Sequence, residues 1–325
     1  MKRDNSIDNA KGILILLVLF GHLISSSPIP PKSLQTTYLF IYLFHIPMFA
    51  FISGKLANLI IDKKRLHNSI NGLLIPFLIF ATINWVISIT LSEKEYFPLT
   101  NPGPLWYLFS LFCWRLLLPI LLRTPSPLII SVTLTLTCGF FPLKGLEKTV
   151  AKTLYFLPFF LMGHFAVHGN HKKLFIINKK LSIAIISCAV ALAYLLPWYS
   201  RDFLLATKAY YYFLLEPFTG VTLRLLLLVF SFYLILSFNN FIPKKEGMIT
   251  NFGKKSLYIY ILHTPLLLIY RLNPDYCIFF NHYSFFLPLI TISSAWILSS
   301  SPVISAYQRI VSLFSLPIHA QSTDD

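Results

Sequence analysis

The chain has 325 residues, of which 56% are hydrophobic and only 12% are charged, and its mean hydropathy is +0.68. A soluble domain carries a far more charged surface, so this composition excludes a soluble globular protein and indicates an integral membrane protein. The net charge of +15 does not indicate nucleic-acid binding, because the basic residues lie in short runs scattered between apolar segments.

Ten apolar stretches have roughly the length of a membrane span, about 20 residues. They predict an all-α membrane protein with one polytopic domain over residues 1–325 and about ten transmembrane helices. The first stretch runs into Ser and Pro without an A-x-A site, so we expect it to serve as the first span without cleavage. The stretches are 11–27, 35–54, 72–91, 104–122, 128–142, 152–168, 181–199, 212–238, 256–272 and 285–301, followed by an expected cytoplasmic tail at 302–325.

The basic residues between these stretches predict the orientation of the chain. Seventeen of the 27 lysines and arginines fall in segments on the same side as the N-terminus, and eight fall on the opposite side. Since cytoplasmic loops are enriched in Lys and Arg, both termini are expected in the cytoplasm, which agrees with an even number of spans.

The cysteines do not indicate a disulfide framework or a metal site. No C-x-x-C spacing occurs, and the four cysteines lie in or beside separate apolar stretches. They are Cys113, Cys138, Cys188 and Cys277.

The first stretch, "KGILILLVLFGH", places Lys11 and His22 at the two ends of ten uncharged residues. Eleven residues advance a helix by about 16 Å and turn it about 20° past three full turns, so the two side chains share one face. One interpretation places His22 at the outer interface or in a bond to a neighbouring helix. The alternative is a functional role, since ionisable groups inside a membrane are costly.

Six sequence blocks in series resemble the acyltransferase-3 family of membrane O-acyltransferases, and within it the fucose 4-O-acetylase-like branch. The resemblance extends over about residues 4–300, and the family signature of a basic residue, ten residues and a histidine falls on Lys11 and His22. The blocks are NAKGILILLVLFGH, FHIPMFAFISGKL, LLIPFLIF, PLWYLFSLF, LPFFLMGHF and GKKSLYIYILH.

The resemblance implies a multi-pass enzyme of the bacterial cytoplasmic membrane, in contact with membrane lipids. It implies transfer of an acetyl group from cytosolic acetyl-CoA, with no permanently bound cofactor and no metal. The expected acceptor is a sugar hydroxyl of a glycan that is lipid-linked or exported, in polysaccharide biosynthesis. A sugar hydroxyl needs a general base, and histidine suits neutral pH. We therefore expect His22 to act either as general base or as a transient acyl acceptor, with Lys11 beside it.

Three further residues within the blocks are candidates for substrate binding. His45 in "FHIPMF" lies near mid-depth of the second stretch and could face His22, or it packs around Pro47. Trp106 in "PLWYL" lines a passage or belongs to the interfacial aromatic belt. His263 in "YIYILH" matches a recurring block of the family.

Two arginines lie inside apolar stretches, where an unpaired charge is rare. Arg115 is about eleven residues into the fourth stretch, and we expect it to face a cavity and bind substrate. Arg224 lies eight residues after Glu216 in the eighth stretch. For Arg224 and Glu216, a structural ion pair with other helices and a substrate contact are both open.

The cytoplasmic segment "DKKRLH" offers Lys63, Lys64 and Arg65 for the phosphates of acetyl-CoA. Positive-inside topology alone would also place such a cluster here. Many members of the family carry a second arginine directly before "LLIP", where this chain has Asn71 and Gly72.

A secondary transporter of a small solute or sugar is the alternative function. Ten spans with scattered intramembrane charge also fit that class, although the two halves of the chain show no repeat. A structural or lipid-scaffold protein is a third possibility, but it would not require Lys11, His22, His45 and Arg115 within the bilayer.

Overall fold

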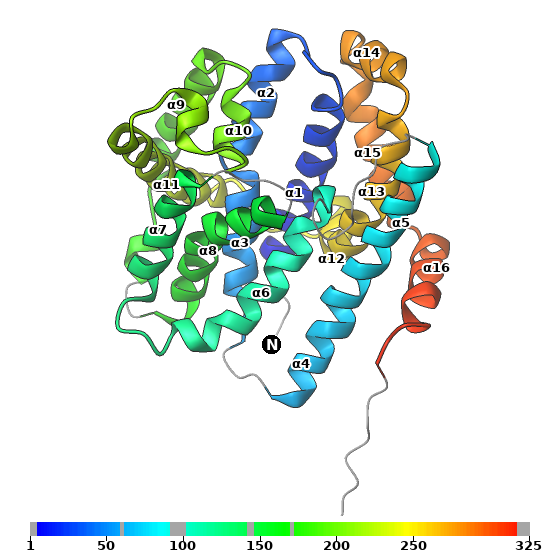
Figure 1. The fold of residues 1–325 in the computed structure, drawn as a ribbon, viewed down its shortest axis with the longest axis horizontal. Coiled ribbons are helices and arrows are strands. Elements are labelled where there is room, and N and C mark those ends of the chain that lie inside the picture. The colour runs from blue at the N-terminus through cyan, green and yellow to red at the C-terminus, as the bar shows by residue number, and fades with distance from the viewer. Residues whose placement is uncertain (1–4, 59–61, 92–101, 142–145, 170–171, 317–325) are drawn as a thin grey trace, which may run out of the picture.

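The computed structural model describes residues 5–58, 62–91, 102–141, 146–169 and 172–316, and within them every regular element is helical (Figure 1). This agrees with the all-α class expected from the sequence. The α-helices are α1 (Asn5–Ile24), α2 (Lys32–Tyr42), α3 (His45–Lys55), α4 (Lys63–Ser69), α5 (Ile75–Leu91), α6 (Trp106–Leu121), α7 (Pro127–Thr137), α8 (Leu146–His168), α9 (Lys179–Leu195), α10 (Ser200–Leu204), α11 (Pro217–Asn239), α12 (Met248–Lys254), α13 (Ser256–Arg271), α14 (Pro274–His282), α15 (Phe286–Leu298) and α16 (Ser301–Ser312).

All ten apolar stretches contain helices, but fewer than ten helices have the length of a membrane span. Within the described residues, six are long and apolar enough to cross a membrane, or up to seven if the bent pair α14 and α15 is one span. The four stretches that form shorter helices correspond to α7, α9, α13 and α15, of 11 to 17 residues. The chain is therefore a multi-pass membrane protein, and the count of ten spans stays a prediction.

The stretch predicted as one span at 35–54 consists of two helices. The chain breaks between Tyr42 and His45, where Phe44 leaves helical geometry with φ −138° and ψ −27°. Pro47 explains the break, because its ring nitrogen cannot donate to the carbonyl of Leu43 and its ring crowds that carbonyl. His45 consequently occupies the first position of α3 and lies beside the break.

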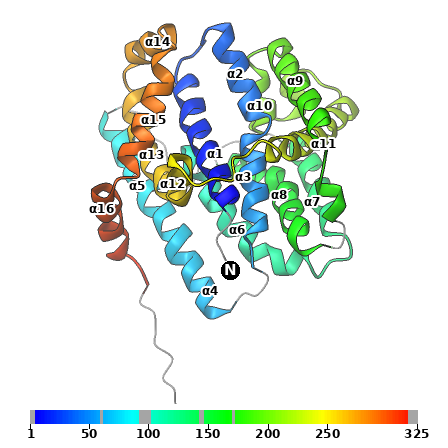
Figure 2. The ribbon, with the colours of Figure 1, turned by 180° about the vertical axis from the view of Figure 1, so that it is seen from behind.

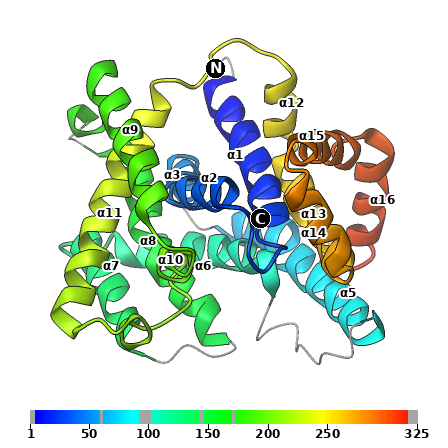
Figure 3. The same cartoon turned by 90° about the horizontal axis from the view of Figure 1, so that it is seen from above.

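Helices α1, α2 and α3 lie between two groups of helices (Figure 3). One group contains α7 to α11 and contacts α2 and α3, chiefly through α8 and α9. The other contains α5 and α12 to α16 and contacts α1 through α12, α13 and α15. The first three helices therefore have the central position in the fold.

Two glycine-mediated crossings hold these central helices. A Cβ atom on Gly54 of α3 would lie 1.8 Å from the carbonyl oxygen of Phe160 on α8, and one on Gly163 would lie 1.8 Å from that of Phe51. In the same way, a Cβ atom on Gly253 of α12 would lie 1.7 Å from the carbonyl oxygen of Asp8 on α1. Helix α12 lies beside α1 in the view from behind (Figure 2). Any side chain here would force the backbones apart, so the crossings fix the positions of α1 and α3.

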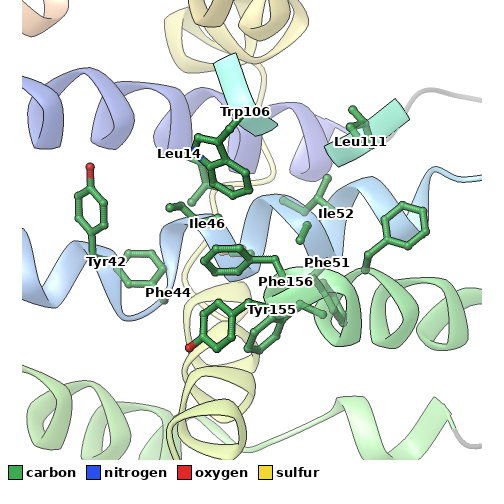
Figure 4. Packing of buried hydrophobic residues seen from close by; sticks show 14 of the residues in the cluster. Leu14, Tyr42, Phe44, Ile46, Phe51, Ile52, Trp106, Leu111, Tyr155 and Phe156 are labelled. Atoms are coloured by element: carbon green, nitrogen blue, oxygen red, sulfur yellow. The ribbon is translucent and has the colours of Figure 1, made fainter. Parts of the chain in front are cut away.

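The core between these helices is largely aromatic. Trp106 stacks on Phe156 with ring centroids 5.5 Å apart, close to Ile46 and Leu14 (Figure 4). Trp114 is fully buried and donates its indole N–H to the carbonyl of Thr153 at 2.8 Å. Such packing fixes the orientation of Trp106 at the N-terminus of α6.

Arg224 is buried within aromatic side chains and does not pair with Glu216. Its guanidinium lies over the rings of Phe203 and Tyr155, at 3.9 and 4.8 Å from their centroids, and donates to the carbonyl of Phe203. Glu216 is exposed at the N-terminus of α11. Among the described residues no carboxylate lies within 4.0 Å of Arg224, so cation–π contacts and a backbone carbonyl satisfy this charge.

The segment expected as a tail, 302–325, begins as helix. Gln308 of α16 donates to the hydroxyl of Tyr258, and the backbone amide of Leu316 donates to the Asn71 side chain at 3.0 Å. Asn71 therefore anchors Leu316, the last described residue of this segment.

Candidate functional site

A cavity of about 420 Å³ lies between α1, α3, α6, α8 and α13. Five of the predicted site residues line it, although they come from three different helices. They are Lys11, His22, His45, Trp106 and Arg115. The fold therefore brings together residues that are more than 100 positions apart in the chain.

His22 is half-buried in the last turn of α1 and lines the cavity. Its ring stacks on that of His263, with centroids 5.3 Å apart and planes at 21°. Among the described residues no side chain or carbonyl is hydrogen-bonded to the His22 ring. Both ring nitrogens are consequently available to a molecule in the cavity.

His263 lies behind His22 and is not part of the cavity wall. Its exposed fraction is 5%, its Nδ1 donates to the carbonyl of Tyr260, and its Nε2 is buried without a partner in the described residues. This position suits support of the His22 ring better than the direct substrate contact expected from the sequence.

His45 has one defined hydrogen bond. Its Nδ1 donates to the carbonyl of Ile41 at 2.8 Å, near the break between α2 and α3. This bond assigns the proton to Nδ1 and leaves Nε2 as an acceptor. The ring of Tyr42 packs edge-on at 4.3 Å and fixes the plane of the imidazole.

Lys11 lines the end of the cavity opposite to His22 along α1. Its ammonium pairs with the Asp8 carboxylate at 2.8 Å, and the Asp8 side chain is only 3% exposed. The sequence reasoning did not identify Asp8. An acid three residues before the lysine on a helix was the available signal, because such pairs share a face.

Arg115 connects the main cavity to a second one of about 180 Å³. Arg65 lines this smaller cavity as well. Lys63 and Lys64 are exposed and line neither cavity. Of the three basic residues expected to bind the donor, only Arg65 therefore reaches a cavity wall.

The middle of the cavity carries hydroxyl groups that the sequence reasoning missed. Ser53 and Tyr107 share a hydrogen bond of 3.0 Å between their oxygens. Tyr260 donates its hydroxyl to the carbonyl of Pro104. Tyrosines are common throughout this chain, so no spacing distinguishes these two from the rest.

Two basic residues at the His22 end were also missed. Lys152 of α8 lies over the face of Trp106 at 5.2 Å, and Arg271 ends α13 with hydrogen bonds to the hydroxyls of Ser25 and Ser26. Both line the cavity. They stand at the ends of apolar stretches, where the sequence makes them look like ordinary loop charges.

The described residues contain no group of three or more His, Cys, Asp or Glu side chains that could hold a metal ion. The chemistry available from the described side chains is that of an imidazole with free nitrogens. It lies beside a long cavity that has positive charges at both ends.

Comparisons with known proteins identify one family. A family model described as an acyltransferase domain matches residues 4–300. The chain is also similar to the nodulation protein NolL of Mesorhizobium japonicum, with 30% identity over 182 residues. That match covers 50% of this chain and 47% of the relative, so the chain spans about half of the relative's length. No solved structure matches.

Proposed function

We propose that this chain, which belongs to the Acyltransferase 3 family and is therefore a membrane O-acyltransferase, transfers an acetyl group from acetyl-CoA to a sugar hydroxyl. The acceptor is a cell-envelope or exported polysaccharide, or its lipid-linked precursor. The resemblance to the fucose 4-O-acetylase-like branch and the similarity to NolL support a sugar as acceptor. The observation that carries the proposal is the His22 ring, free of hydrogen bonds, in the wall of a long cavity.

The donor enters at the end of the cavity that carries Lys11 and Arg115. Arg115 and Arg65 line the adjoining smaller cavity and supply guanidinium groups for the phosphates of CoA. Lys11 lies about 16 Å from His22 along α1, a distance that the extended pantetheine arm has to bridge to bring the thioester to the imidazole.

His22 activates the acceptor as a general base. An imidazole nitrogen accepts the proton of the sugar hydroxyl while the oxygen of that hydroxyl attacks the thioester carbonyl. The carbon–sulfur bond then breaks, the CoA thiolate takes the proton from the imidazolium, and the sugar ester is released. In the alternative route the His22 nitrogen attacks the thioester first and the CoA thiolate leaves. The acyl-imidazole then passes the acetyl group to the sugar oxygen, and the hydroxyl proton goes to the thiolate.

The orientation follows from the charges of the sequence. Both termini and the Lys63–Arg65 segment lie in the cytoplasm of a bacterial cell, where acetyl-CoA is made. His22 then lies toward the outer side, and the ten apolar stretches form the membrane domain. An acceptor presented at the outer side meets the acetyl group inside the cavity.

Reconstituted vesicles test the proposal against a secondary transporter. The purified protein is supplied with acetyl-labelled CoA and a crude lipid-linked glycan fraction, and the label is followed into the glycan. We expect protein-dependent label that mild alkali releases, as expected for an O-ester. Uptake of a sugar into the vesicles without any acetyl transfer would contradict the proposal and support the transporter.

A further inference from the structure

The end of the cavity beyond His22 holds two cations from different helices. Arg271 closes α13 and Lys152 lies in the second turn of α8, and both line the cavity. Each is close enough to the His22 imidazole to interact with it electrostatically. This end of the cavity wall therefore carries two positive charges.

Neither cation forms an ion pair with a described residue, although Asp202 attracts Lys152 from a longer distance. Among the described residues no carboxylate lies within 4.0 Å of either Arg271 or Lys152. Lys152 is stabilised by the ring of Trp106, and Arg271 by two serine hydroxyls. Lys152 is half-buried and Arg271 is exposed at the end of α13, so this end of the cavity carries positive charge that attracts a negative ligand.

The Arg271 guanidinium is held in a fixed orientation. Its Nε and Nη2 atoms donate to Ser26 and Ser25 at 3.1 and 3.3 Å, and both serines also donate to the carbonyl of His22. Because a guanidinium carries five N–H donors, donors remain for an oxyanion in the cavity. This network also ties the arginine to the turn that carries His22.

The site is separate from the donor end. Ser25 follows Lys11 by fourteen residues, which places Arg271 about 21 Å along α1 from the expected entry of CoA. His22 lies between them, only three residues, or about 5 Å, before Ser25. A CoA molecule with its thioester at His22 therefore has its phosphates on the far side from Arg271.

We infer that Arg271 and Lys152 bind an oxyanion carried by the acceptor, either a sugar carboxylate or a phosphate linked to the sugar. This inference rests on the proposed function and narrows its substrate to anionic glycans. A planar guanidinium binds carboxylate and phosphate oxygens in pairs, and the ammonium adds a point charge. The bound group places a neighbouring hydroxyl at the His22 imidazole.

Protection of a cysteine in the cavity tests the inference without measuring catalysis. Leu205 lines the cavity but takes no part in the serine network, so Leu205→Cys, in a protein with the four native cysteines replaced, reports on occupancy. The protein is labelled with a polar maleimide in the presence of D-glucuronate, inorganic pyrophosphate or D-glucose at equal ionic strength. We expect at least one anion to slow labelling about fivefold or more, and glucose to have no such effect.

Which anion protects distinguishes a sugar carboxylate from a phosphate. The variants Arg271→Gln and Lys152→Gln should each lose the protection, and Lys208→Gln should keep it, because Lys208 stacks on Tyr212 outside the cavity. If neither anion protects, or glucose protects equally, the inference is wrong. The three probes are compared on the Leu205→Cys protein itself, so this result is decisive even if a Gln variant fails to insert. Acetyl transfer is assayed separately, so anion protection without transfer would refute only the proposed function.

Discussion

The donor end of the cavity contains a buried ion pair. Asp8 is almost fully buried, and the ammonium of Lys11 lies 2.8 Å from its carboxylate. Removing one partner of a buried pair costs about 3–5 kcal/mol, mainly because the other charge stays buried. A loss of activity on mutation of Lys11 can therefore arise from instability or from the reaction, and the two have to be separated.

The Lys11 prediction uses a double variant for this purpose. Lys11→Arg should keep much of the acetyl transfer, and Lys11→Ala should lose both transfer and thermal stability. Asp8→Asn combined with Lys11→Ala should regain the thermal midpoint but not the activity. If the double variant transfers acetyl groups normally at both low and saturating acetyl-CoA, Lys11 serves only structure and topology.

Arg115 should affect the donor more than the acceptor. It lines both cavities, and a hydrogen bond to a charged group contributes about 1.5–3 kcal/mol, so Arg115→Gln should raise the KM for acetyl-CoA about tenfold or more. Arg65→Gln should act in the same direction. Lys64→Gln is the matched control, since Lys64 is exposed and lines neither cavity. Equal effects of all three would mean that only general cytoplasmic charge matters.

The sequence predicted those cavity-lining residues that carry an unusual charge in an apolar stretch. Lys11, His22 and Arg115 are of this kind, because a titratable group within ten apolar residues is distinctive. Lys152 and Arg271 line the same cavity but stand at the ends of apolar stretches. Only the packing of α8 and α13 shows that they face inward and not toward a loop.

At the scale of elements, hydropathy predicted where helices lie but not where they break. The second stretch reads as one apolar run, yet Pro47 divides it and puts His45 beside the carbonyl of Ile41, which also accepts from the backbone amide of Phe44. Likewise α14 and α15 are bent by 118° relative to each other. A window average over 19 residues has no information on such bends, since it depends on composition alone.

The crossing of α3 and α8 gives a prediction about stability. Gly54→Ala should lower the stability of the purified protein by about 1–3 kcal/mol, because its Cβ meets a backbone carbonyl that cannot move aside. Gly72→Ala is the control, as nothing lies within 4 Å of its Cβ position, and it should be neutral or stabilising by about 0.5–1 kcal/mol. Thermal unfolding in detergent measures both, and equal midpoints would contradict the close crossing.

At the scale of the whole molecule, the sidedness of the reaction depends on the orientation in the membrane. The charge bias of the sequence predicts both termini inside, and the two ends of the cavity then face opposite compartments. This prediction assigns the Lys11 end of the cavity to the cytoplasm and the His22 end to the outer side. An independent measurement of sidedness is therefore needed.

Labelling of single cysteines provides it. With the native cysteines replaced, Ser26→Cys should react with a polar maleimide added outside, and Lys64→Cys should react only when the reagent reaches the inside. Saturating acetyl-CoA should protect Arg65→Cys, because this position lines the smaller cavity. Labelling of Ser26→Cys solely from the cytoplasm would invert the topology, and protection at Ser26 alone would place the donor at the acceptor end.

The most direct test of the account is acetyl transfer by His22→Ala in reconstituted vesicles. The ring of His22 is free of hydrogen bonds in the described structure and lines the cavity, so its loss should abolish transfer while leaving insertion and amount unchanged. His282→Ala, an exposed histidine on α14 outside the cavity, should transfer normally. Undiminished product from a well-inserted His22→Ala protein would remove His22 from the mechanism and contradict the central claim.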